Sequence, residues 1–151
     1  ADLFRATLEN PDRLSTLGQE IELAKGYLNI ESMRLGDRLK VSWQIDDSLE
    51  RVQMPSMMLQ PLLENAVYHG IEVSAEGGLI NVTVKQSGNI VSIEISNTVS
   101  HSGKNAGRKG NHMAQDNIRK RLQAFFGEKA GFEIEDDKSS YLIRMQFPVN
   151  Q

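Results

Sequence analysis

One stretch, residues 60–70, constrains the fold more than any other part of the chain. It reads Gln-Pro-Leu-Leu-Glu-Asn-Ala-Val-Tyr-His-Gly. Its apolar residues recur at helical spacing, so we expect an amphipathic helix that ends at Gly70, where a glycine lets the chain turn left-handed. Asn65 and His69 share one stripe of this helix, and Glu64 lies at the edge of that stripe. These polar groups have two interpretations. They are either hydrogen-bonded side chains of a buried structural helix, the interpretation that the helix taken alone favours, or a binding site for a hard cation and its anionic ligand.

Alternation of apolar and polar residues predicts strands on both sides of this helix. They are expected at 39–45, 80–84, 91–95, 132–135 and 141–147, with tight hairpin turns near 87–89 and 136–139. Further helices are expected from a capping box at Thr16 and Gln19 to Leu35, and from Met113 to Phe126. Ser56 is expected to cap the central helix. Paired strands with few crossovers predict an α+β fold, a mixed or antiparallel sheet with its helices on one face.

The segment from Asn97 to Asn111 differs from the rest of the chain. It holds three glycines and three basic residues and almost nothing apolar. No core can bury such a sequence, so it is expected to form a surface loop. Taken alone it is a solvated linker. Its place between a strand and a helix instead favours a loop that binds anions, because backbone N–H groups and the helix dipole attract negative charge there.

Composition narrows the classes of function. The net charge of -3 argues against direct nucleic-acid binding. The chain has no cysteine, which excludes disulfides and thiolate chemistry. No apolar run approaches the roughly 20 residues of a membrane span, and no signal peptide is visible. Because the chain opens at Ala1 in what reads as helical sequence, we expect it to be a fragment of a longer protein.

Three motifs resemble those of GHKL ATPases, a group that includes histidine kinases, type II topoisomerases, MutL and heat-shock chaperones. Residues 59–70 resemble the N box, in the variant typical of LytS/AlgZ(FimS)-type two-component sensor histidine kinases. Residues 27–39 resemble the segment of that subgroup between the phosphoacceptor helices and the ATP-binding domain. Residues 110–122 resemble its second glycine box. The resemblance covers residues 14–149, and three ordered motifs are more specific than one.

The resemblance implies the Bergerat fold, a two-layer α/β sandwich with a mixed sheet, helices on one face and a flexible ATP lid. It implies that residues 1–38 lead from an absent phosphoacceptor domain, and that residues 39–151 form the catalytic ATP-binding domain. The implied partners are a response regulator of the LytTR type and the phosphoacceptor helices of the same protein or of its mate in a homodimer. The implied location is the cytoplasmic side of a bacterial inner membrane, to which the full protein is anchored.

The implied ligands are ATP and Mg2+. By resemblance, Asn65 holds the Mg2+ through its amide oxygen, Glu64 lies beside the metal or its waters, and His69 faces the phosphates. Asn97 lies where most relatives place an Asp that binds the adenine amino group. The other residues expected to contact ATP are Thr98, Lys104, Gly110, His112, Met113, Ala114, Gln115 and Asn117.

The chain also departs from the family pattern. The first glycine box, Asp-x-Gly-x-Gly, is replaced by Asn97-Thr98-Val99-Ser100-His101, and His112 and Ala114 stand where the second box has glycines. The phosphoacceptor motif is absent, so we expect the fragment to bind nucleotide without phosphorylating itself. Two alternatives stay open: a degenerate domain that acts as a scaffold without nucleotide, and a hydrolase that uses Glu64 as its base.

Overall fold

The computed structural model describes residues 13–72, 74–98, 112–137 and 139–149. The helices are α2 (Leu17–Leu35), α3 (Leu59–Ala66) and α4 (His112–Phe126), and a π-helical turn (Val67–Glu72) continues α3. Short 3-10 turns lie at Gly36–Arg38, Asp47–Leu49 and Gly127–Lys129. The strands are β1 (Leu14–Thr16), β2 (Leu39–Ile45), β3 (Gln53–Pro55), β4 (Gly78–Ser87), β5 (Ile90–Thr98), β6 (Gly131–Asp136) and β7 (Ser140–Pro148). None of the helices in these ranges is long and apolar enough to cross a membrane.

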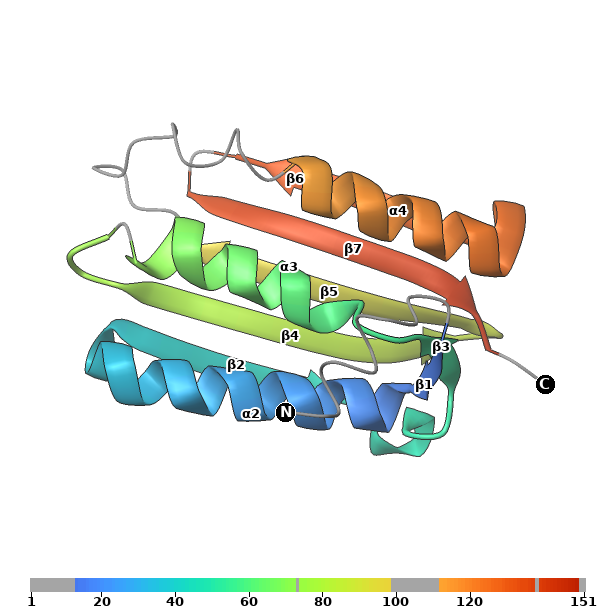
Figure 1. Ribbon diagram of the computed structural model, residues 1–151, viewed down its shortest axis with the longest axis horizontal. Helices are drawn as coiled ribbons and strands as arrows, with labels where there is room; N and C mark the ends of the chain where they lie inside the picture. The colour runs from blue at the N-terminus through green and yellow to red at the C-terminus, as the bar shows by residue number, and fades with distance from the viewer. Residues whose placement is uncertain (1–12, 73, 99–111, 138, 150–151) are drawn as a thin grey trace.

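Five strands form one mixed sheet in the order β2-β4-β5-β7-β6. The β2–β4 pair is parallel and the other three pairs are antiparallel. The three helices lie side by side on one face of this sheet (Figure 1). The predicted fold class, a two-layer sandwich with its helices on one face, is therefore confirmed. A second sheet, β1 paired with β3, was not predicted, because strands of three residues are too short to show alternation.

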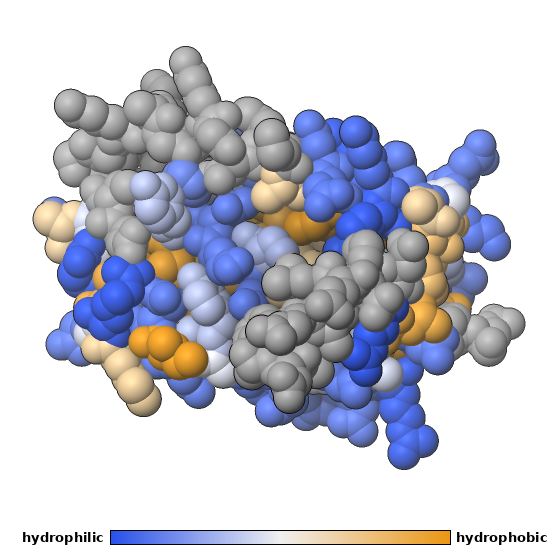
Figure 2. Space-filling view, in the orientation of Figure 1, coloured by the Kyte–Doolittle hydropathy of each residue, from blue (hydrophilic) through white to orange (hydrophobic). Residues whose placement is uncertain are grey.

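The two faces of the sheet differ in polarity, which explains why one face has no helices. The inner face carries the core side chains, among them Ile80, Val82, Ile93 and Phe147. On the outer face Arg144 joins two strands, with its Nε 2.6 Å from a Glu94 carboxylate oxygen and an Nη 3.5 Å from one of Glu133. This charged row stays in water, so the sheet buries only one face. The outer surface of the helical layer is mostly hydrophilic (Figure 2).

Helix α2 begins and ends where the sequence predicts. Thr16 Oγ1 accepts from Gln19 N, and Gln19 Oε1 accepts from Thr16 N, so the capping box is present. The helix ends at Gly36, whose φ of 60° is left-handed. Its apolar face joins the same core as the sheet and packs on α3. The proposed division between residues 38 and 39 stays a prediction.

Helix α3 differs from the prediction at both ends. Ser56 does not cap it, because the N-cap residue is Met58, which makes no side-chain capping bond. At the other end the α-helix stops at Ala66, and the π turn carries the chain past Gly70, which is not among the residues of positive φ. The glycine is needed for space instead: a Cβ at this position would lie 2.3 Å from Asn97 Nδ2.

The segment after β5 begins later than predicted. Asn97 and Thr98 are the last two residues of β5 rather than loop residues, since they pair with β4 and β7. The rest of the predicted lid, residues 99–111, lies outside the described residues. Helix α4 ends at Gly127 as predicted, with a φ of 69°. Phe126 stacks on Phe147 in the core, whereas its neighbour Phe125 is exposed.

Candidate functional site

A small hollow between α3, α4 and the sheet brings together four of the polar residues predicted from the sequence. They are Asn65 and His69 from α3 and its π turn, Asn97 from β5, and Gln115 from α4. The remaining lining residues are Leu62, Ala66, Ile95, Tyr141 and Ile143. Residues 65, 97 and 115 are far apart in the sequence, so this grouping is a product of the fold.

Strand register explains why Tyr141 belongs to this group. Asn97 and Tyr141 are directly opposite each other in the β5–β7 pair. Gln115 Nε2 donates a hydrogen bond of 2.6 Å to the Tyr141 hydroxyl oxygen, so α4 is tied to the sheet at the hollow. Tyr141 was missed in the sequence analysis because nothing local marks it. Only the pairing register of the last hairpin could have pointed to it.

Asn97 is held firmly at the end of β5. The residue is 7% exposed, and its Nδ2 donates to Thr98 O at 3.1 Å. Gly70 leaves the space that the Asn97 amide occupies. Next to it, Thr98 Oγ1 accepts from Leu79 N at 3.0 Å. With its amide nitrogen engaged by the backbone, the side chain has its carbonyl oxygen to offer as an acceptor to a ligand.

Two buried polar atoms that line the hollow lack hydrogen-bond partners among the described residues. They are Asn65 Nδ2 and Gln115 Oε1. An unsatisfied buried polar atom costs about 1–3 kcal/mol. A donor and an acceptor left open in one hollow fit a site that a polar ligand completes.

The size of the hollow limits what it holds as it stands. Its volume is about 30 Å³, which is enough for roughly one or two water molecules. A nucleotide is many times larger, so these residues contact only one part of it unless α3 and α4 move apart. His69 lines the hollow, and the ring of its exposed neighbour Tyr68 meets the imidazole edge-on at 4.6 Å between centroids.

Glu64 does not line this hollow. Its side chain is exposed. Partial desolvation raises the pKa of the Glu64 carboxyl above its ordinary value, and the charge of Glu31 on α2 raises it further. The carboxyl is therefore influenced by α2, and its implied place beside the metal or its waters stays a prediction.

The other predicted residues are distributed as follows. Ala114 and the exposed Asn117 lie on α4 outside the lining, as Thr98 does on β5. His112 and Met113 belong to the first turn of α4, but their side chains are not described. Lys104 and Gly110 lie outside the described residues. The roles of all these residues stay predictions.

The described residues contain no group of three or more His, Cys, Asp or Glu side chains that could hold a metal ion. The polar side chains at the hollow are instead three amides, an imidazole and the Tyr141 hydroxyl. One amide oxygen, from Asn65, suits a Mg2+ that takes its other ligands from phosphates and water, because magnesium in nucleotide sites usually has one or two protein ligands. The residues present therefore fit a metal that arrives with a nucleotide.

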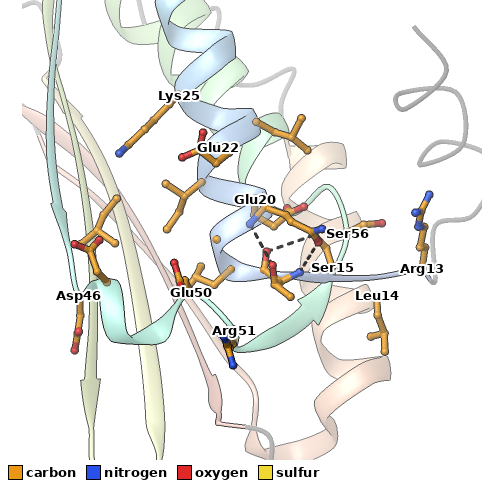
Figure 3. A pocket seen from close by; sticks show the side chains of 18 residues that line it. Arg13, Leu14, Ser15, Glu20, Glu22, Lys25, Asp46, Glu50, Arg51 and Ser56 are labelled. Atoms are coloured by element: carbon orange, nitrogen blue, oxygen red, sulfur yellow. Dashed lines mark hydrogen bonds between the residues drawn. The ribbon is translucent and has the colours of Figure 1, made fainter.

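A larger hollow, of about 600 Å³, lies at the start of α2 (Figure 3). None of the predicted site residues lines it. Its charged residues have both signs: Arg13, Glu20, Glu22, Lys25, Asp46, Asp47, Glu50 and Arg51. Although this hollow is larger, we do not assign the functional site to it, because neither the sequence motifs nor the buried unpaired amide atoms lie there.

A mixed sheet with helices on one face is also the fold of solved histidine-kinase catalytic domains. Residues 1–39 match the family model described as Histidine kinase. Sensor histidine kinase BtsS of Escherichia coli K12 is 30% identical over 146 residues, which are 96% of this chain and 26% of that protein. Sensor protein LytS of Oceanobacillus iheyensis is 28% identical over 164 residues, which are 98% of this chain and 28% of that protein.

Solved structures agree with this fold. The nucleotide-free catalytic domain of histidine kinase ThkA matches with a TM-score of 0.65 and 14% identity, covering 91% of this chain and 95% of that one. ThkA in complex with response regulator protein TrrA matches with a TM-score of 0.58 and 13% identity, covering 91% and 42%. The chain is thus similar in sequence to sensor histidine kinases and has the fold of their catalytic domains. It spans about a quarter of the length of the curated relatives it matches.

Proposed function

We propose that this chain is the ATP-binding catalytic part of a sensor histidine kinase of the LytS/AlgZ type. It binds Mg-ATP so that the γ-phosphoryl group can pass to a histidine in another domain. The observation that supports this most is the grouping of Asn65, His69, Asn97 and Gln115 around one hollow with two buried unpaired amide atoms. A purely structural cluster would be expected to satisfy those atoms internally.

Each residue has a role that its surroundings support. Asn97, with its amide nitrogen engaged by Thr98, offers an acceptor that suits the adenine amino group. Asn65 offers an amide oxygen to Mg2+, and His69 lies where it can face phosphate. Bound Mg2+ supplies charge neutralisation at the phosphates. The chain contributes orientation and electrostatics, which are the main protein contributions in phosphoryl transfer.

The partners follow from the same proposal. The phosphoryl group passes from the histidine to an aspartate of a response regulator, in line with the ThkA–TrrA complex among the solved structures. A LytTR-type regulator, a homodimeric parent and an inner-membrane anchor complete the proposal, supported by the similarity to LytS. Residues 1–39, which match the kinase family model, lead toward the phosphoacceptor histidine.

Calorimetric titration with Mg-ATP tests the proposal. We expect binding by the wild type and loss of binding in Asn65→Ala, at unchanged melting temperature. Asn29→Ala is the matched control, because this exposed asparagine of α2 does not line the hollow and is not among the predicted ATP contacts. No binding up to millimolar ATP argues against the proposal. Steady release of phosphate from ATP would instead favour a hydrolase.

A second candidate is a degenerate domain that acts as a scaffold without nucleotide. The altered first glycine box and the small volume of the hollow, about 30 Å³, favour it. The two candidates differ in a full-length parent: normal signalling by Asn65→Ala indicates a scaffold, whereas lost signalling indicates a kinase.

A further inference from the structure

The turn formed by Ser56, Met57 and Met58, hereafter the 56–58 turn, leads directly into α3 and has an unusual backbone. Met57 has a φ of 57°, a left-handed conformation that a side chain with a Cβ adopts only under constraint. The N-cap residue of α3, Met58, offers no side-chain capping bond. Something outside this turn must therefore hold it.

Glu20 on α2 holds the turn through its N–H groups. The carboxylate accepts from Met57 N at 3.1 Å and from Met58 N at 2.8 Å. Glu20 is 3% exposed, so its charge needs compensation. The two N–H donors and the positive end of the α3 dipole provide it. Figure 3 shows Glu20 beside Ser56. The cap of α3 thus comes from a residue 38 positions away from Met58.

Arg121 on α4 holds the same turn through its carbonyl groups. One guanidinium nitrogen donates to Ser56 O at 2.6 Å, and another to Met57 O at 3.4 Å. Arg121 is partly buried against the turn, unlike the exposed Lys120 beside it. The start of α3 is therefore bonded to α2 on its donor side and to α4 on its acceptor side.

We propose that Glu20 and Arg121 are positioning residues for the nucleotide site. The hollow lies between α3, which carries Asn65, and α4, which carries Gln115. A turn that α2 and α4 both grip fixes where α3 begins, and with it the distance between these two walls. The inference rests on the proposed function of the hollow, and it assigns to two residues outside the lining the task of setting its geometry.

The first test needs no nucleotide. The side-chain amide signals of Asn65 and Gln115 are followed by ¹⁵N NMR in Glu20→Gln and Arg121→Lys, with Glu22→Gln and Lys120→Gln as matched controls on the exposed faces of the same helices. Glutamine retains one acceptor of the two, and lysine cannot span two carbonyls as a guanidinium does. We expect both amide signals to shift in the two test variants and to stay in place in the controls. Unchanged signals in the test variants overturn the inference.

The second test compares ATP affinity in Mg2+ with affinity in EDTA, at a temperature where circular dichroism shows every variant folded. In Glu20→Ala, displacement of Asn65 should lower the ratio of ATP affinity in Mg2+ to ATP affinity in EDTA roughly tenfold, by analogy with residues that orient metal ligands. Glu20→Gln should lower this ratio less, and the ATP affinity measured in EDTA should change little in either variant. A merely structural role leaves the ratio of the two affinities unchanged, and that result also overturns the inference. If the wild type does not bind ATP, the proposed function fails. The NMR test still decides whether Glu20 and Arg121 position the amides of Asn65 and Gln115.

Discussion

Gly70→Ala tests the close packing of the π turn on the end of β5. The new Cβ would lie 2.3 Å from Asn97 Nδ2, 2.9 Å from Asn97 Cγ and 3.2 Å from Thr98 O. The first two distances are far inside van der Waals contact, so the Asn97 amide must move. Because Gly70 has no positive φ, alanine meets no backbone penalty, and the clash alone determines the outcome.

The magnitude follows from three contributions. Overpacking typically costs about 1–3 kcal/mol, and loss of the Asn97–Thr98 hydrogen bond adds about 1 kcal/mol. Alanine returns about 0.4–1 kcal/mol by restricting the unfolded chain. We therefore expect a net loss of about 1–3.5 kcal/mol in the free energy of unfolding. Each kcal/mol lowers Tm by about 2–4 °C in a domain of this size.

Urea unfolding followed by the fluorescence of Trp43, the single tryptophan, measures this loss. The midpoint should fall at an unchanged m value, because the surface exposed on unfolding is the same. Gly26→Ala is the matched control. It lies within α2, and apart from the neighbouring backbone of its own helix no atom lies within 4 Å of its added Cβ. The substitution should therefore stabilise the protein by about 0.5–1 kcal/mol.

The two alanine variants should thus change stability in opposite directions. If Gly70→Ala is as stable as Gly26→Ala, the π turn does not pack closely on Asn97, and close packing does not explain the glycine at position 70. Gly70→Ala should also weaken Mg-ATP binding, since Asn97 is the proposed acceptor for the adenine amino group. Unaltered binding by a destabilised variant would separate packing from recognition.

Three further predictions concern charge. Because the folded state raises the pKa of Glu64, the ionised carboxylate opposes folding at neutral pH. Glu64→Gln should therefore stabilise the protein at pH 7. This stabilisation should disappear as the pH falls through the raised pKa toward 4.5. Urea unfolding midpoints of the wild type and Glu64→Gln across this pH range measure the stabilisation, and a difference between the two proteins that does not change with pH contradicts the prediction. Hydrogen bonds from the backbone N–H groups of residues 139 and 140 lower the pKa of Asp137, so Asp137→Ala should destabilise above pH 3.8 and lose its effect as the pH falls through the lowered pKa; the same titration would refute this if the effect grew in acid. Arg38→Ala removes hydrogen bonds to Ile71 O and Ser74 O and should cost about 1.5–3 kcal/mol in urea unfolding, whereas the exposed Arg51→Ala should cost little; equal losses would contradict this account.

Local signals predicted much of the architecture. The capping box at Thr16 and Gln19 fixed the start of α2, and Gly36 and Gly127 fixed two helix ends, because caps and left-handed glycines act within a few residues. Alternation located the five strands of the main sheet, since one buried face imposes a period of two. Asn65 and His69, predicted from their spacing to share one stripe of a helix, both line the hollow.

Contacts between distant segments explain what the sequence analysis missed. Ser56 has the residue type of a cap, yet the cap of α3 comes from Glu20, because a carboxylate buried by tertiary packing can bind two N–H groups at once. Tyr141 joins the hollow only through the register of β7 on β5. Gly70 suggested a left-handed turn, but its lack of a side chain makes room for Asn97, 27 residues later.

The sequence by itself determined the helices, the main strands and the motif residues on which the proposed site depends. Those features depend on periodicity and on neighbours a few residues away, which the order of amino acids specifies directly. Only the tertiary structure decided what the apolar face of α2 packs against, how β5 ends, and which atoms in the hollow remain unpaired. Each of these depends on surfaces that meet across long stretches of chain, where packing and hydrogen-bond geometry override local preference.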